Sequence, residues 1–140
     1  MPAGIKPETL KEIAEYLDIG MLCFYNKANG EVEYYPDELE DSGLEDEWAE
    51  VTDKIAAFPG NYLQIEKMSS REAFKVMESF IDNISHIPTR NRFEAAISHK
   101  KPFAHFNEML SYYPDIREQW FIYKQNCYIE YVKSQFDLNS

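Results

Sequence analysis

Two residues with metal-binding and acid–base chemistry, His105 and Glu108, lie three positions apart in the stretch KKPFAHFNEMLSYYPD. On a helix this spacing places both side chains on one face, where they could share a proton or a metal ion. A catalytic zinc site needs three protein ligands and a water, so a third ligand must come from Glu94, His99 or His86. The simpler interpretation is a surface pair beside a core-facing stripe. We therefore expect no metal and no other cofactor.

The strongest charge feature is a run of eight carboxylates in residues 37–50, with no basic residue among them. An EF-hand does not fit this run, because placing Gly43 at the sixth loop position puts Ala49 where a bidentate Glu is required. The run is interpreted as a solvated loop, as a docking surface for a basic protein, or as a weak divalent-cation site. A docking surface could be a simple charged patch or a mimic of nucleic-acid phosphates. The candidate binding residues are Tyr25, Tyr34 and Tyr35 of a predicted hairpin and Asp37, Glu38, Glu40, Asp41, Glu45, Asp46 and Glu47, and Glu50 completes the run.

A basic strip in residues 86–101 is the second charge feature, with a local net charge of +3 and only Glu94 opposing it. The strip is interpreted either as a solvated helical edge or as an anion site. With no glycine-rich loop nearby, the solvated edge is the simpler interpretation. The candidate anion-binding residues are Arg90, Arg92, Lys100 and Lys101.

Motifs of the common catalytic classes are missing from the sequence. It contains no G-x-S-x-G elbow, no P-loop, no G-x-G-x-x-G and no H-E-x-x-H. Cys23 and Cys127 lie among apolar residues, which predicts two reduced, buried and unreactive thiols rather than a disulfide or a Cys–His dyad. Carboxylates are abundant, so a carboxylate-dependent or metal-dependent enzyme stays as an alternative.

Composition limits the class of protein further. The chain has 140 residues, 44% of them hydrophobic and 15% aromatic, which is enough to bury a core and excludes disorder of the whole chain. No apolar run is long enough to cross a bilayer, and the first residues carry no secretory signal, so we expect a cytoplasmic protein without a membrane partner. The net charge is −11, and all of this excess lies in residues 1–70. Such a surface disfavours nucleic acid as a partner.

The first half of the chain must supply a helix and a small sheet. PETLKEIAEYLDIG predicts a helix ended by Gly20, and MLCFYNKANGEVEYY predicts a hairpin that turns at Asn29 and Gly30. NYLQIEK, residues 61–67, alternates and predicts a third antiparallel strand. The acidic segment between them is expected to start as a loop and to become a short helix through Trp48, Val51 and Ile55.

The second half predicts helices throughout. Ser69 and Glu72 have the spacing of a capping box, and helices opened by Pro88 and Pro102 follow. The last helix, about 116–136, is apolar on most of its circumference. It must therefore be the central helix of the fold or be covered in part by a second copy in a homodimer.

The order of these pieces resembles the bacterial uncharacterised protein family 0158. The resemblance rests on FYNKANGEVEYYPD, on YLQIEKMSSREAFKVMESFIDNI and on the segment PFAHFNEMLSYYPDIREQWFIYKQNCYIEYVKSQF, and it covers about residues 8–136. The chain departs from the pattern at Lys100-Lys101-Pro102 and at Ala104-His105, where the family has a glycine-rich entry and arginines, so no role of those arginines is carried over. The resemblance implies an α+β fold and the bacterial cytoplasm, and it implies no activity.

The sequence therefore predicts a single α+β domain over residues 1–140. A small antiparallel sheet, the hairpin plus a third strand, packs on a bundle of about five helices with the C-terminal helix central. Residues 1–67 hold the first helix, the hairpin and the acidic loop, and residues 68–137 form the helical part. We expect a non-enzymatic protein-interaction module. The alternatives are a carboxylate or metal enzyme and a small nucleic-acid-associated factor using the basic strip.

Overall fold

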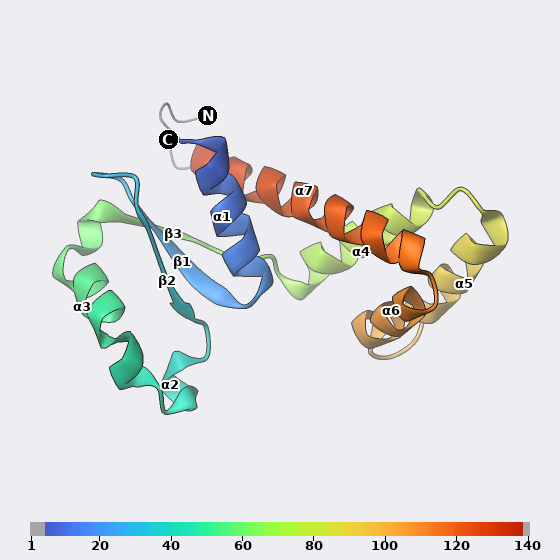
Figure 1. Cartoon of the computed structure of the whole chain (residues 1–140), viewed down its shortest axis with the longest axis horizontal. Coiled ribbons are helices and arrows are strands. Elements are labelled where there is room, and N and C mark those ends of the chain that lie inside the picture. Colours follow the sequence, from blue (N-terminus) through green and yellow to red (C-terminus); the bar gives the residue numbers. More distant parts are fainter. Residues whose placement is uncertain (1–4, 139–140) are drawn as a thin grey trace. The chain divides into compact units, whose positions relative to one another are not determined.

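A computed structural model describes residues 5–138 of the chain, except for the side chains of residues 40 and 41. The predicted binding residues Glu40 and Asp41 therefore have side chains outside the described part. Helices and one small antiparallel sheet make up the structure, as Figure 1 shows, and this confirms the predicted α+β class.

The chain divides into two compact units. The first unit comprises Met1–Lys67 and Tyr128–Ser140, and the second comprises Met68–Cys127. Helix α7 (Pro114–Leu138) contributes residues to both units. The first unit thus takes its residues from both ends of the chain, whereas the second is one continuous segment.

The sheet belongs to the first unit and contains the hairpin predicted at Asn29 and Gly30. Gly30 has a φ of +78°, which is open to a residue without a Cβ, and its N–H donates to the Asn26 carbonyl at 2.8 Å. The third strand, also predicted, pairs antiparallel with β1, so the strand order is β2-β1-β3. The elements of this unit, apart from α7, are α1 (Pro7–Asp18), β1 (Met21–Asn26), β2 (Val32–Pro36), α2 (Leu39–Ser42), η1 (Glu45–Trp48), α3 (Ala49–Ala57), η2 (Pro59–Asn61) and β3 (Tyr62–Ile65).

One face of the sheet packs on apolar side chains of α1 and α7. Cys23 of β1 and Ile65 of β3 are opposite each other in register, and both are fully buried in one cluster with Ile13 of α1. Burying side chains of this size stabilises the fold by about 1.5–3 kcal/mol each. The buried members of this core are Ile5, Leu10, Ile13, Ala14, Leu17, Cys23, Ile65, Val132 and Phe136.

Helix α3 packs against β2, and Figure 1 shows α1 and α3 on opposite sides of the sheet. The Lys54 ammonium of α3 lies 2.7 Å from a carboxylate oxygen of Glu33 on β2. The segment expected to be an acidic loop is partly helical, because it contains α2 and the 3-10 turn η1. Carboxylates in the first turn of a helix interact favourably with its dipole, so this composition is compatible with short helical turns.

A side-chain amide occupies the backbone next to strand β3, which is an edge strand of the sheet. Gln135 of α7 accepts a hydrogen bond from the Glu66 N–H at 3.0 Å and donates one to the Glu66 carbonyl at 2.5 Å. The Tyr131 hydroxyl donates to the Lys67 carbonyl at 3.2 Å. These bonds satisfy backbone groups that an unprotected edge would offer to another chain.

The second unit is helical, and its first helix begins with the predicted capping box. The Glu72 N–H donates to the Ser69 hydroxyl at 3.1 Å, and the Ser69 N–H donates to the Glu72 carboxylate at 3.0 Å. Its core is built mainly from rings, with Phe106 lying 4.8 Å from Trp120 and 5.6 Å from Phe93 between centroids. The helices are α4 (Ser70–Asp82), α5 (Ile87–Ile97), α6 (Pro102–Ser111) and the first part of α7.

Helix α7 is apolar on several sides because it supplies two cores in succession. Ile116, Trp120 and Tyr123 pack in the core of the second unit, whereas Val132 and Phe136 pack in the core of the first. Phe121 and Ile122 of the same helix are 45% and 58% exposed, so the prediction that the helix is covered on most of its circumference is wrong at these positions. A single stripe cannot serve two cores, and this explains the several stripes seen in the sequence.

Both cysteines are free thiols, and only one of them is fully buried. Cys23 is buried in the first core, and Cys127 is half-buried. Burial raises the pKa of the Cys23 thiol to about 12, with a smaller contribution from Glu12. The expectation of two buried thiols therefore holds for Cys23 and is wrong for Cys127.

Candidate functional site

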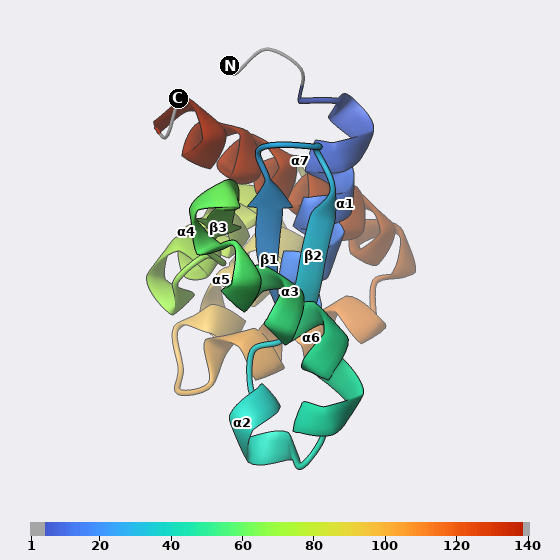
Figure 2. The same cartoon turned by 90° about the vertical axis from the view of Figure 1, so that its left-hand side faces the viewer.

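The carboxylates of residues 37–50 line a continuous segment of the first unit. We call the exposed side chains of Asp37, Glu38, Glu45, Asp46, Glu47 and Glu50 the acidic surface. Figure 2 shows how the chain leaves β2, passes through α2 and returns across the sheet as α3. The 3-10 turn η1 places three of these carboxylates at consecutive positions.

Two lysines lie near this segment, and both are engaged with carboxylates. Lys54 contacts Glu33 at 2.7 Å and Glu31 at 3.8 Å, and the hydrogen bond from Glu33 is the largest cause that raises its pKa. Lys67 pairs with Asp37. In the described part of the chain, no ion pair involves the five remaining carboxylates of the acidic surface, Glu38, Glu45, Asp46, Glu47 and Glu50.

The charge of the protein is divided unequally between its two units. The first unit holds 18 acidic and 6 basic side chains, a net charge of −12, and the second holds 7 and 8, a net charge of +1. Two like charges about 6 Å apart in water repel by about 0.7 kcal/mol before salt screening. The exposed carboxylates of the acidic surface therefore raise its negative potential at a modest cost in stability.

The three hairpin tyrosines do not share one face of the sheet. Tyr34 stacks on Tyr16 of α1 at 3.9 Å, and Tyr25 packs edge-on against Phe136 at 5.0 Å, so both belong to the face covered by α1 and α7. Tyr35 alternates to the opposite face, where it stacks on Phe24 at 5.4 Å. All three are half-buried by these contacts.

Stacking also changes the acidity of the ring pair beside α1. A hydrogen bond with Tyr34, followed by burial, raises the pKa of Tyr16 to about 12. Tyr34 also lies 6.1 Å from Trp48, at the start of the segment that carries α3. These rings therefore position the acidic segment, and the contact surface is formed by the carboxylates.

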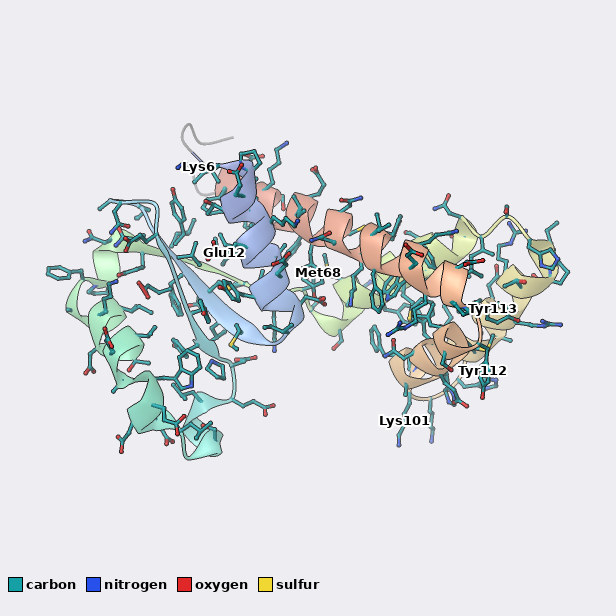
Figure 3. The ribbon with its side chains drawn as sticks, viewed as in Figure 1. Lys6, Glu12, Met68, Lys101, Tyr112 and Tyr113 are labelled. Carbon is teal, nitrogen blue, oxygen red and sulfur yellow. The ribbon has the colours of Figure 1, made fainter. Side chains whose placement is uncertain are left out.

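The basic strip is divided between engaged and exposed side chains. On α5, Arg90 lies 3.9 Å from Glu94, and Arg92 donates to the Tyr113 hydroxyl at 2.9 Å. Lys100 and Lys101 lie in the turn before α6, where Lys101 has a positive φ of 56°. Figure 3 shows the Lys101 side chain directed away from the helices.

The histidine and glutamate that opened the sequence analysis lie exposed on α6. His105 and Glu108 have one further close histidine, His99, whose ring centroid lies 6.4 Å from that of His105. Within residues 5–138, side chains of described position form no group of three His, Cys, Asp or Glu residues suited to a metal ion. Glu94 lies apart from this pair, in a groove of about 350 Å³ that it lines with Glu78, Asp82 and other residues of α4 and α5.

A second groove of the second unit was not predicted. It has a volume of about 490 Å³ and lies between α4 and α7. Gln119 and Asn126 were interpreted from sequence only as part of the polar strip of the last helix, although their spacing of seven residues was the available signal. The lining residues are Phe80, Asn83, Ile84, Gln119, Ile122, Tyr123 and Asn126.

Fold and surfaces together define an α+β protein with one strongly acidic unit and one nearly neutral helical unit. The chain belongs to the uncharacterised protein family UPF0158, whose family model matches residues 6–137. No curated protein and no solved structure matches the chain. Across residues 5–138, no helix combines the length and the apolar character that crossing a membrane requires.

Proposed function

We propose that this protein is a non-enzymatic interaction module that binds a basic protein partner through the acidic surface of its first unit. The observation that carries this proposal is the imbalance of charge at the acidic surface. Glu38, Glu45, Asp46, Glu47 and Glu50 are exposed, and among the described residues none of them has a cation to neutralise it.

The position of the surface supports binding by charge complementarity. Lys54 and Lys67 are held by carboxylates at or beside β2, so a cation from outside the chain does not have to displace them to reach η1. Lysine and arginine side chains of a partner would meet closely spaced carboxylates without like-charge competition. Such surfaces raise the rate of association and contribute specificity more than affinity. Phosphate groups, by contrast, would be repelled by a unit of net charge −12.

The free thiols of Cys23 and Cys127 support a reducing compartment, so we place this activity in the cytoplasm. The tyrosines of the hairpin enter this proposal as supports of the acidic segment. Tyr34 is the one that links α1, the sheet and Trp48, through its two ring contacts.

The test is affinity capture with two variants of equal net charge. In the first, Glu45, Asp46, Glu47 and Glu50 become Gln, Asn, Gln and Gln, which changes the net charge from −11 to −7. The matched control replaces four exposed glutamates elsewhere by Gln and reaches the same net charge. The control positions are Glu8, Glu12, Glu108 and Glu118.

We expect the wild type and the control to retain the same basic proteins from a lysate, and the first variant to lose them. Retention should also fall steeply as salt rises, because the Debye length shrinks from about 10 Å at 0.1 M to about 3 Å at 1 M. Equal retention by the two variants would show that the acidic surface is only solvated. Equal loss in both would show that net charge matters and that the position of the carboxylates does not.

A further inference from the structure

The groove between α4 and α7 combines an apolar floor with uncharged hydrogen-bonding groups. Phe80 and Ile84 of α4 are almost fully buried and lie at its base with Tyr123, whereas Ile122 is 58% exposed beside them. No lysine, arginine, aspartate, glutamate or histidine lines this groove. A charged ligand would lose hydration here without gaining a partner, so the groove suits an uncharged ligand.

Three carboxamides surround this floor, and their hydrogen-bonding capacity is largely unused. The Asn83 amide donates to the Ser79 carbonyl at 2.8 Å, which leaves its oxygen as an acceptor. Gln119 and Asn126 have no hydrogen-bond partner among the described residues, and both are exposed. Each of these two side chains can therefore donate through its NH₂ group and accept through its oxygen.

Helix α7 already shows what such a side chain does with extended backbone. In the first unit, Gln135 bonds both the N–H and the carbonyl of Glu66, at 3.0 and 2.5 Å. A carboxamide can pair in this way because it presents one donor and one acceptor side by side, as a peptide group does. Gln119 and Asn126 offer the same pair of groups, with no peptide of the chain on them.

The spacing of these two side chains matches an extended peptide. Seven residues separate Gln119 from Asn126, which is about 10.5 Å along a helix at 1.5 Å per residue. Three residues of extended chain cover about 10 Å at 3.3 Å per residue. A strand lying along α7 would therefore bring peptide groups to both carboxamides while one of its side chains faces the apolar floor between them.

We propose that this groove binds an uncharged, apolar peptide segment in extended conformation. Gln119 and Asn126 pair with its backbone, and an apolar side chain of the peptide packs on Ile84. This site is distinct from the acidic surface and takes ligands of different chemistry. Its affinity depends on burial and neutral hydrogen bonds, so it tolerates salt that would remove a basic partner from the first unit.

The test uses a random peptide library displayed on phage and selected on the full chain in about 0.5 M salt, where charge attraction is screened. We expect enriched peptides to be uncharged and to share a central aliphatic or aromatic residue. The best peptide is then synthesised with blocked ends. A second form of it carries N-methyl groups on the central amides, which removes hydrogen-bond donors and keeps the apolar side chain.

Binding is measured by nuclear magnetic resonance titration of the full chain. The unmodified peptide should shift the side-chain amide signals of Gln119 and Asn126, and the N-methylated form should bind about tenfold more weakly, which is the effect of losing about one hydrogen bond. Asn126→Ala should weaken binding to a similar extent. Asn91→Ala, an exposed asparagine on α5, serves as the control and should leave binding unchanged.

Several results would overturn the proposal. A library without enrichment on this face would do so, and so would equal binding of the N-methylated peptide, which would indicate a purely apolar site. Concentration-dependent shifts of the Ile122 and Asn126 signals in the absence of peptide would show that a second copy of the chain covers the groove instead. Loss of basic partners after neutralisation of the acidic surface would not bear on this site.

Discussion

The amide of Gln135 should contribute measurably to stability, because it bonds both backbone groups of Glu66 beside an edge strand. Replacing it by methionine keeps the length of the side chain and removes both bonds. Each net contribution is about 0.5–1.5 kcal/mol, so we expect a loss of about 1–2 kcal/mol in the free energy of unfolding. Gln135→Glu should cost at least as much, because a carboxylate then faces the Glu66 carbonyl and cannot donate to it.

Denaturant titration would measure these losses, and hydrogen exchange would locate them. The Glu66 amide should exchange faster in both variants than in the wild type. The difference between Gln135→Glu and wild type should shrink below about pH 4, because the protonated acid regains a donor. Unfolding free energies within about 0.3 kcal/mol of wild type, together with unchanged exchange at Glu66, would refute the reasoning; a change this small is typical of a surface substitution.

Three further predictions concern other contacts. Ser69→Ala removes the hydroxyl of the capping box and should lower stability by about 1 kcal/mol in a thermal or denaturant melt, and Ser70→Ala should have no comparable effect. Phe106→Ala removes a 2% exposed ring from the second core and should cost about 3–5 kcal/mol, seen as loss of exchange protection in α5 and α6. Because burial raises the pKa of Cys23 to about 12, its contribution to stability is complete below about pH 8.5, the pKa of an unfolded thiol, and falls as pH rises toward 12. Thiol titration at pH near 8 should therefore modify Cys127 before Cys23 in the native protein, and simultaneous modification would contradict the assigned burial.

Local signals in the sequence were sufficient for the individual elements. The Asn29-Gly30 turn, the alternation that predicted β3, and the spacing of Ser69 and Glu72 each depend on neighbours within a few residues. The last helix begins at Pro114, two positions before its expected start, because proline is well suited to the first turn of a helix.

Long-range pairing could not be read in the same way. Nothing near Gln135 indicates that Glu66 is its partner, and nothing near Lys67 indicates Asp37, because these contacts depend on how distant elements pack. The tyrosines show the same limit from another side. Alternation along β2 requires Tyr34 and Tyr35 to point to opposite faces, but their adjacent carboxylates suggested one common binding surface.

The candidate site was predicted as a set of charges and not as a shape. Counting carboxylates located the acidic surface, since exposure follows from charge. The groove beside Asn126 remained unseen, because its floor comes from α4 and its rim from a helix more than thirty residues later in the chain. Sequence periodicity identifies which residues leave a helix on one side, and it does not show which other helix they meet.

The division of α7 between two cores has a consequence for synthesis on the ribosome. Residues 68–127 are contiguous, so every contact within the second unit is available once that segment has left the exit tunnel. The sheet emerges earlier but has to wait, because Val132 and Phe136 complete the core beneath it. The middle of this chain can therefore become native while its beginning is still incomplete, and a ribosome that stalls near residue 127 would hold a finished helical unit beside an uncovered sheet.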